Sequence, residues 1–393
     1  MSVLNGFKKL VKDRLGIPEY NPKPYLYPTQ KQSVLGTVLY SYLDYPLSWN
    51  ERDIRFDGHS NLWESYDVVH IFNALGFNVE AVAWTNQFFY PEKQYDVVFD
   101  IHTNLQRWLP FLDKSSKKIL HLTGSYFEFQ KDAELSRVSA FERRTGMFYS
   151  PKRVPADLVL AERSHRFANI CSLIGNEQTL SSYPSAYQEK ISLIPVSGSK
   201  LDYIKRKSQE YIPAAREFMW FYGGGAVHKG LDLVLEVFKK NPKLKLHVVA
   251  KLESERDFFL AYGDVLLRSS NVTYHGYLHP SSQKFKDIAA RVVANLGPSC
   301  SEGISPAIVT CMQYGLYPII SRYNGITLPE KAGMYLESCS ISEIEEKIFQ
   351  VAAMTNEQIV EQIKVIQAFA LAEYSRENFS KKMRAFLVKA LGL

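Results

Sequence analysis

The chain has 393 residues, of which 46% are hydrophobic and 22% are charged, and its formal net charge is +6. This composition is ordinary for a globular protein and excludes a mainly disordered chain, and because a single core rarely grows beyond about 250–300 residues, we expect two domains. The sequence contains no run of about 18 apolar residues, so it predicts no membrane-spanning helix. The mild positive charge suits an anionic small ligand or a membrane surface at least as well as a nucleic acid.

The first 33 residues form an extension that precedes the first predicted strand. Within it Val3, Phe7, Leu10 and Val11 fall on one helical face, with lysines and an arginine elsewhere. This pattern is typical of a basic helix at a membrane surface, and equally of a helix packed on its own domain. Residues 1–15 are therefore our candidate for a membrane contact.

Short apolar runs alternate with helical patterns along the rest of the first half, which predicts an α/β domain with a parallel sheet. A helix begins at Ser60, a residue type that caps helix N-termini, and ends at Gly76. We expect strands over residues 36–43, 77–83, 95–101 and 117–122, and weaker strands over residues 157–161 and 191–195.

The second half alternates more clearly between strands and helices. Its predicted strands cover residues 217–222, 244–249, 271–276, 291–296 and 316–321. Its predicted helices cover residues 229–240, 253–268 and 281–290, a further helix runs from Pro306 to near Gly315, and the chain is helical from residue 340 onward.

A polar stretch around residues 196–213 separates the two halves. We therefore expect an N-terminal Rossmann-like domain over residues 1–200 and a C-terminal one over residues 213–375. Residues 376–393 form a last helix that can return to the N-terminal domain. Two such domains joined by a linker leave a cleft between them, and ligands of these sheets bind beyond the carboxyl ends of the strands.

Two turns between a strand and a helix in the second half carry the strongest functional signal. The first is Gly223-Gly224-Gly225, followed by Lys229 at the predicted start of a helix. Glycines allow a close approach of the backbone to an anion, and a helix N-terminus offers free N–H groups. The spacing matches neither a Walker A loop nor a G-x-G-x-x-G turn, so by itself it is equally a tight turn.

The second turn spans residues 297–306 and reads GPSCSEGISP. Glu302 precedes the next helix N-terminus. A carboxylate there is either a cap that contributes about 0.3–1 kcal/mol or a ligand for a sugar hydroxyl.

Together the two turns resemble the nucleotide-binding domain of GT-B glycosyltransferases of the family 4 type. In that family a glycine turn, a Lys-Gly pair and, about seventy residues later, a Pro-Ser…Glu-Gly turn follow one another, as Lys229-Gly230 and Pro298-Ser299…Glu302-Gly303 do here. The strand over residues 317–321, preceded by Gly315, extends the likeness, which covers residues 217–325 well and the first half weakly.

The resemblance implies that a sugar moves, with retention, from a nucleoside diphosphate donor. Glu302 and His121 would be the catalytic residues, facing the donor sugar from the two domains. The donor-binding residues that it implies are Gly223, Gly224, Gly225, Lys229, Gly303, Ile304, Ser305 and Thr310.

The chain departs from the family pattern at two positions. Thr310 stands where the family has a second glutamate for the ribose hydroxyls, and glycines stand where it has an arginine five or six residues before the lysine. Uncompensated, the two losses would weaken donor binding on the order of 10²–10⁴-fold. His228 and Lys251 are nearby basic residues that can compensate, and the extra glycines can bring further N–H groups to the phosphates.

Loops at the carboxyl edge of the first sheet are the candidates for the acceptor site. We select Gly58 and His59 before the first predicted helix, and Tyr126, Arg143 and Arg144 after the His121 strand. For each residue taken singly, a place in a solvated helix or loop is the simpler interpretation.

Other chemistries have no motif in this sequence. It lacks Asp-x-Asp, G-x-S-x-G, H-E-x-x-H and a clustered Cys/His site, and its aromatic residues form no nucleic-acid motif. The four cysteines are Cys171, Cys300, Cys311 and Cys339. They lack metal-ligand spacing and do not suggest a disulfide scaffold, so we expect a protein of the reducing cytosol.

We therefore expect a hexosyl- or other glycosyltransferase that needs no metal or cofactor and uses a UDP- or GDP-linked sugar. Its acceptor would be a glycan or glycolipid of a surface polysaccharide, made in the cytoplasm at the inner face of the membrane. A non-catalytic GT-B module that binds a glycan or a partner protein stays open, and so does a nucleotide-sugar epimerase that needs no acceptor.

Overall fold

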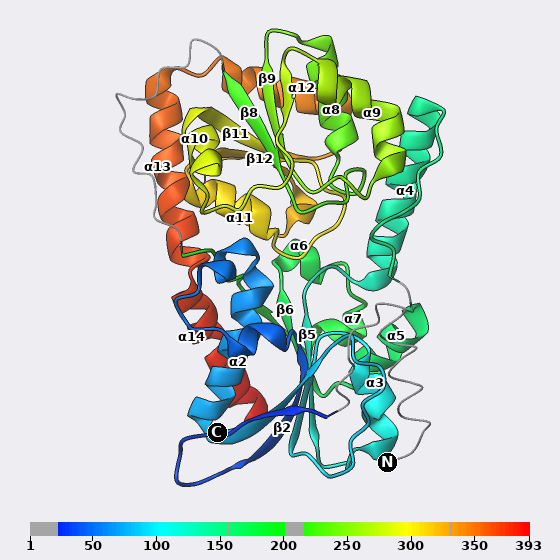
Figure 1. The fold of residues 1–393 in the computed structure, drawn as a ribbon, viewed down its shortest axis with the longest axis vertical. Coiled ribbons are helices and arrows are strands. Elements are labelled where there is room, and N and C mark those ends of the chain that lie inside the picture. The colour runs from blue at the N-terminus through cyan, green and yellow to red at the C-terminus, as the bar shows by residue number, and fades with distance from the viewer. Residues whose placement is uncertain (1–22, 156, 201–215, 331) are drawn as a thin grey trace, which may run out of the picture.

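The computed structural model describes residues 23–155, 157–200, 216–330 and 332–393. Over these ranges the chain forms two α/β domains, each built on its own sheet and stacked along the long axis of the molecule (Figure 1). The membrane contact predicted for residues 1–15 lies outside the described residues.

The first sheet has seven strands in the order β1-β3-β2-β4-β5-β6-β7, and all neighbours pair in parallel except β1 with β3. All four residues of β4 are buried, as expected for a parallel strand covered on both faces. The strands are β1 (Tyr25–Tyr27), β2 (Gly36–Tyr42), β3 (Phe77–Ala83), β4 (Val97–Asp100), β5 (Lys117–Leu122), β6 (Ile170–Ile174) and β7 (Ile191–Ile194).

The second sheet has six parallel strands in the order β10-β9-β8-β11-β12-β13. Chain order reverses between β8 and β11 here, and between β2 and β4 in the first sheet, so each domain has a topological switch point. The strands are β8 (Glu217–Phe221), β9 (Lys245–Val249), β10 (Val272–Tyr274), β11 (Val292–Gly297), β12 (Tyr317–Ser321) and β13 (Met334–Leu336).

Helices cover the faces of both sheets (Figure 1). The first domain contains α2 (Ser60–Leu75), α3 (Asn104–Trp108), α5 (Leu158–Phe167), α6 (Glu177–Leu180) and α7 (Ser185–Gln188). The second contains α8 (Leu231–Lys240), α9 (Arg256–Arg268), α10 (Gln283–Arg291), α11 (Pro306–Gln313), α12 (Ile341–Ala352) and α13 (Asn356–Glu373). Short 3-10 helices are η1 (Tyr45–Ser48), η2 (Ile54–Gly58), η3 (Leu109–Phe111) and η4 (Arg322–Asn324).

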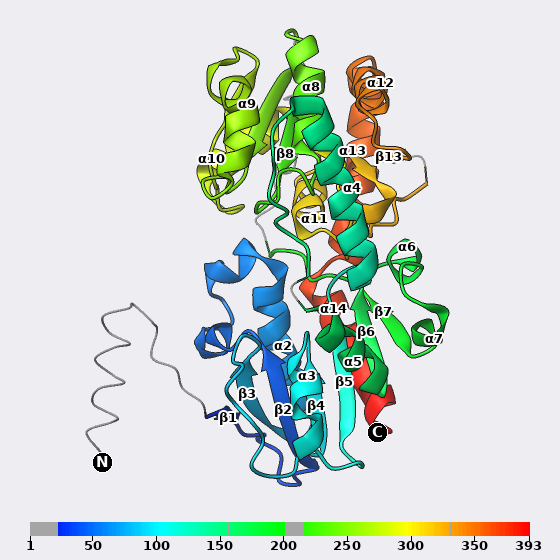
Figure 2. The same cartoon turned by 90° about the vertical axis from the view of Figure 1, so that its right-hand side faces the viewer.

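Helix α4 (Phe127–Thr145) leaves the first domain and runs beside the second (Figures 1 and 2). Its Phe141 is fully buried and packs against Phe258 and Tyr262 of α9, and Arg144 forms an ion pair with buried Asp232 of α8. We call residues 127–155, which comprise α4 and the segment after it, the arm. The arm belongs to the first half of the sequence and packs on the second domain.

Helix α14 (Arg376–Leu391) crosses in the opposite direction and packs against α2 and β7 of the first domain. Ser380 donates a hydrogen bond to Asp67 of α2 at 2.5 Å. Figure 1 shows this last helix in red beside α2. The C-terminal helix therefore lies on the N-terminal domain.

The predicted elements of the second half agree with the structure to within a few residues, but two predictions in the first half are wrong. Residues 157–161 do not form a strand, because the Asp157 carboxylate accepts the N–H of Leu160 at 2.9 Å and caps α5. His59, not Ser60, caps α2. Strands β1, β6 and β13 were not predicted.

Candidate functional site

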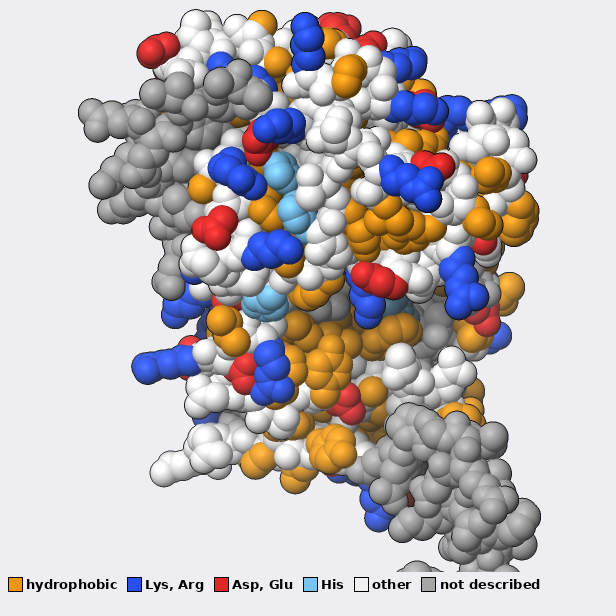
Figure 3. Space-filling view, turned by 45° about the horizontal axis from the view of Figure 1, so that its top comes forward, with side chains coloured by type: hydrophobic (Ala, Val, Ile, Leu, Met, Phe, Trp, Pro, Cys, Tyr) orange, Lys and Arg blue, Asp and Glu red, His pale blue; other side chains and the backbone are white. Residues whose placement is uncertain are grey.

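A cavity of about 350 Å³ lies between the two domains. It is lined by residues that follow β2 and β4 in the first domain and β8 and β11 in the second, so it lies at the switch points of both sheets. In the space-filling view a hollow crosses the middle of the molecule, with hydrophobic side chains along it and basic side chains near its rim (Figure 3).

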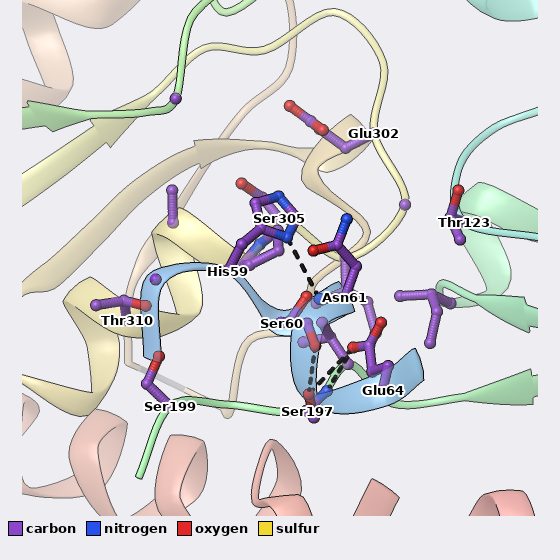
Figure 4. A pocket seen from close by; sticks show the side chains of 18 of the residues that line it. His59, Ser60, Asn61, Glu64, Thr123, Ser197, Ser199, Glu302, Ser305 and Thr310 are labelled. Carbon is purple, nitrogen blue, oxygen red and sulfur yellow. Dashed lines mark hydrogen bonds between the residues drawn. The ribbon is translucent and has the colours of Figure 1, made fainter. Parts of the chain in front are cut away.

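The wall from the first domain begins where η2 turns into α2. Gly58 lies against the second domain, since a Cβ there would stand 3.3 Å from His279 Nε2. His59 Nδ1 accepts the N–H of Asn61 at 3.3 Å, which caps α2 and turns the imidazole into the cavity. Figure 4 shows His59 and Asn61 facing Ser305 and Glu302 of the second domain.

The wall from the second domain is centred on Lys229 and Glu302, whose side chains form an ion pair. The Lys229 N–H donates to Gly225 O at 2.8 Å, which fixes the backbone at the end of the glycine turn. Ser299 donates to Glu302 Oε1 at 2.8 Å. The ion pair with Lys229 and the hydrogen bond from Ser299 together hold the Glu302 carboxylate in place, a few residues before the N-terminus of α11.

Several other predicted donor residues line the same cavity. Gly223, Gly303, Ile304 and Ser305 do so, and Thr310 lies one turn into α11. The first turn of a helix carries N–H groups without intrahelical partners and the positive end of the helix dipole. The cavity therefore offers an ammonium group, a carboxylate and a helix N-terminus to one ligand.

The glycine turn differs from the prediction at Gly225. Its N–H donates to Glu255 Oε1 at 2.6 Å, and the Ala226 N–H donates to Glu255 Oε2 at 2.9 Å. Tyr149 of the arm donates to the same carboxylate at 2.8 Å. Glu255 therefore occupies the N–H groups of Gly225 and Ala226. Of the three glycines only Gly223 lines the cavity.

Burial shifts the pKa of three groups at the site. Burial, with the nearby charge of Arg153, lowers the pKa of the Lys229 ammonium well below its usual value, so an anion in the cavity would stabilise the charged form. Desolvation between the domains lowers the pKa of His59 to about 4, although part of the residue is exposed to solvent. Burial raises the pKa of Glu64, which also lines the cavity, to about 7.

His121 does not line the cavity. Its ring is fully buried, Nδ1 lies 2.7 Å from Ser172 Oγ of the neighbouring strand, and burial lowers its pKa to about 3. The ring of Phe99 stacks on it, and Tyr42, packed against its edge, lines the cavity in its place. His121 is placed as a core histidine of the first sheet.

Three of the predicted acceptor residues also lie away from the cavity. The Tyr126 hydroxyl donates to Glu162 at 2.6 Å within the core of the first domain. Arg144 pairs with Asp232, and Arg143 is exposed on α4. The acceptor residues Gly58 and His59 do line the cavity.

The two basic residues proposed to replace the missing arginine do not line the cavity either. His228 is buried, with Nε2 2.7 Å from Ser301 O. Lys251 is exposed, and its carbonyl faces Gly224.

Sequence reasoning missed Arg153, Trp84 and His102, which all line the cavity. Trp84 and His102 pack ring to ring, with centroids 4.5 Å apart. Trp84 directly follows β3, and His102 closely follows β4. Because ligands of such sheets bind beyond the carboxyl ends of the strands, both residues could have been selected from the sequence. Arg153 lies in the arm, and no local pattern indicates that it reaches this cavity.

The two domains touch beside the cavity at Gly303. A Cβ there would stand 2.5 Å from Ile174 O and 2.6 Å from Thr123 O of the first domain. Ser125 of the first domain donates to Glu302 O at 2.8 Å. Only a glycine allows this approach, so Gly303 sets how closely the domains meet.

No helix within the described ranges has both the length and the apolar composition needed to cross a membrane. Among the same residues no group of three or more His, Cys, Asp or Glu side chains is placed to hold a metal ion.

No model of a known protein family matches the sequence, and no curated protein sequence matches it. The structure is similar to that of sucrose-phosphate synthase from Thermosynechococcus elongatus, with a TM-score of 0.61 and 10% identity over 91% of this chain and 99% of that one. It is also similar to the catalytic domain of starch synthase IV from Arabidopsis thaliana, solved with ADP and acarbose, with a TM-score of 0.57 and 12% identity over 92% and 100% of the two chains. HepE from Anabaena, solved with UDP and glucose, has a TM-score of 0.55 and 12% identity over 91% and 99%.

At these identities the likeness shows the fold, which is that of the GT-B glycosyltransferases. The predicted class, α/β with two Rossmann-like domains facing a cleft, is confirmed. Membership of family 4 and retention of configuration stay predictions.

Proposed function

We propose that this chain is a glycosyltransferase that moves a sugar from a UDP- or GDP-linked donor to a glycan or lipid-linked acceptor. The observation that carries the proposal is that Lys229, Glu302 and the start of α11 meet in one cavity at the switch points of both sheets. A nucleoside diphosphate fits this combination, because a helix N-terminus and an ammonium group both favour phosphate.

The proposed chemistry follows from where charge develops. As the acceptor hydroxyl forms the new glycosidic bond and passes its proton to the departing phosphate, the sugar–phosphate bond breaks. Negative charge grows on the diphosphate, and Lys229 with the first-turn N–H groups of α11 would stabilise it. No metal ion is part of this scheme. Glu302 would bind the donor sugar once the diphosphate takes its place beside Lys229, and transfer with retention is the outcome that the family resemblance favours.

The wall from the first domain is the place we assign to the acceptor. Trp84 is 38% exposed and stands beside His102, and His59 and Asn61 add polar groups. Aromatic faces with a few convergent polar groups suit a sugar ring. A role in surface polysaccharide synthesis, in the cytoplasm at the inner membrane face, is part of the same proposal and rests on the family resemblance.

A non-catalytic GT-B module is the second candidate, and two observations favour it. Thr310 supplies one hydroxyl where two bonds to ribose are expected, and Glu255 occupies N–H groups of the glycine turn. In this reading the cavity holds a glycan or a partner segment without turnover.

Calorimetry with UDP and GDP tests the proposal. We expect one of them to bind the wild-type protein, and Lys229→Ala to weaken that binding on the order of 10–100-fold, since a hydrogen bond to a charged group contributes about 1.5–3 kcal/mol. Lys251→Ala removes an exposed lysine outside the cavity and is the matched control, with little change expected.

Thermal unfolding of each variant shows whether it is folded, because Lys229→Ala also leaves Glu302 without its ion-pair partner. Absence of heat with both nucleotides, or equal binding by the folded Lys229→Ala variant, would favour the non-catalytic module. Release of free or altered sugar from donor alone would instead indicate an enzyme without an acceptor.

A further inference from the structure

Arg153 is a basic residue at the cavity whose guanidinium has no hydrogen bond or ion pair among the residues that the structure describes. It lines the cavity with Gly223, Lys229 and Glu302, although it comes from the first half of the chain. Its side chain is exposed to the cavity solvent. The other cation of this wall, Lys229, is paired with Glu302.

The backbone of Arg153 is held firmly by the arm. Glu134 of α4 is fully buried, and its Oε1 accepts the N–H groups of Lys152 at 2.7 Å and Arg153 at 2.8 Å. Gln130, one turn earlier on α4, donates to Arg153 O at 2.5 Å. The backbone on both sides of the side chain is thus fixed, while the guanidinium itself is left for a ligand.

The arm is in turn fixed to the second domain. Tyr149 donates to Glu255, and the Ser150 N–H donates to Asp257 Oδ2 at 3.2 Å. Arg137 donates to Pro298 O at 2.8 Å, in the turn that carries Glu302. Arg153 therefore keeps its position relative to the second-domain wall of the cavity.

The surroundings of Arg153 favour an anion. A Cβ at Gly225 would stand 3.2 Å from Arg153 Nε, so the glycine leaves the guanidinium room beside the turn. Lys229, His59 and Arg153 all line the cavity, and beside the larger effect of burial the charge of Arg153 lowers the pKa of the other two. Among the described residues, Glu302 is the one cavity-lining carboxylate that forms an ion pair with Lys229, His59 or Arg153.

We propose that Arg153 binds the phosphates of the donor together with Lys229, so that an arm from the first half of the chain completes the donor site of the second domain. This inference rests on the proposed function. The planar guanidinium fork matches two phosphate oxygens at once, which an ammonium group cannot do. Since Glu255 occupies the N–H groups of Gly225 and Ala226, a side chain rather than these amides contacts the phosphate at this place.

Binding of nucleotides that differ only in their phosphates tests this inference. UDP, GDP, their nucleosides and inorganic pyrophosphate are titrated into the full chain, into Arg153→Ala and into Lys152→Ala. Lys152 is the matched control, because it is the neighbouring exposed cation and its ammonium lies 3.9 Å from Asp257 instead of facing the cavity.

We expect Arg153→Ala to weaken binding of the diphosphate on the order of 10–100-fold and to leave the melting temperature unchanged, because the guanidinium has no partner to lose. Binding of the nucleoside should not change. Arg153→Lys keeps the charge without the fork and should fall between Arg153→Ala and wild type. Lys152→Ala should bind like wild type.

The outcomes separate the two proposals. If the wild type binds a diphosphate and Arg153→Ala binds it equally well, Arg153 is not a phosphate ligand, and the proposed function stands. If Lys152→Ala weakens binding as much as Arg153→Ala, a general charge effect replaces the specific contact. If pyrophosphate binds as tightly as the nucleotide, Arg153 and Lys229 form a general phosphate site, and the assignment of Arg153 to a nucleotide-sugar donor is wrong. If the wild type binds neither nucleotide, the proposed function is wrong and the role of Arg153 falls with it.

Discussion

At the scale of single residues, the ion pair between Lys229 and Glu302 is the central contact of the site. The two opposite charges are largely buried and stabilise each other, since each alone would be costly to bury. A diphosphate that enters beside Lys229 replaces the carboxylate as its partner. Glu302 then becomes free to bind the sugar, so one ion pair is exchanged for two contacts with the donor.

Glu64 carries a prediction about pH. It is buried in the cavity wall, with Oε1 accepting the N–H of Ser197 at 3.0 Å, and burial raises its pKa from 4.5 to about 7. Between these values the folded protein holds a proton that the unfolded chain has released, so the free energy of unfolding falls as pH rises through this interval. Ionisation of this group costs the folded state roughly 3 kcal/mol at about 1.4 kcal/mol per pKa unit.

Glu64→Gln keeps the size of the side chain and an oxygen for Ser197. In denaturant titrations between pH 4.5 and pH 8, wild type should lose up to about 3 kcal/mol relative to this variant. Other carboxylates titrate in both proteins, so the difference isolates Glu64. Parallel stability curves for the two proteins would show that Glu64 ionises normally in the folded state.

At the scale of elements, the arm joins the two halves of the sequence. Its helix α4 presents a stripe of buried residues, Glu134, Val138 and Phe141, to the second domain. Phe141 packs between Tyr149 of the arm and two rings of α9. The packing of α4 therefore positions Arg153 at the cavity.

Phe141→Ala should lower the free energy of unfolding by about 3–5 kcal/mol, because it opens a cavity among closely packed rings. Arg143→Ala on the same helix changes an exposed side chain and should stay within about 0.5 kcal/mol of wild type. Denaturant unfolding measures both. Equal stability losses in the two variants would mean that α4 is not docked through Phe141.

The element scale also shows where sequence reasoning works and where it stops. Lys229, Glu302 and Ser305 could be found because each lies at a strand-to-helix turn, and such turns gather at the carboxyl edge of a parallel sheet. His121 could not be placed, because β5 is buried on both faces. The sequence pattern therefore does not tell whether a residue near the end of this strand lies in the core or at the cavity. The partner of α4 could not be predicted either, because a buried stripe does not name the domain that covers it.

At the scale of the whole molecule, the chain passes between the domains more often than a two-domain sequence suggests. The arm packs on the second domain before the chain continues in the first, residue 200 lies in the first domain and residue 216 in the second, and α14 lies on the first domain again (Figure 2). Asp57 binds two of these segments, since its carboxylate accepts bonds from Arg376 of α14 at 2.7 Å and from the Lys200 N–H at 2.8 Å. Both domains therefore contribute residues to one site.

A crystal structure of the protein with UDP or GDP bound tests the account most directly. We expect the diphosphate between the domains, with its oxygens within hydrogen-bond distance of Lys229 Nζ, the Arg153 guanidinium and the first N–H groups of α11. Glu302 should have left Lys229 for the ligand. A nucleotide seated outside this cavity, or seated in it with its phosphates directed away from Lys229, would contradict the account.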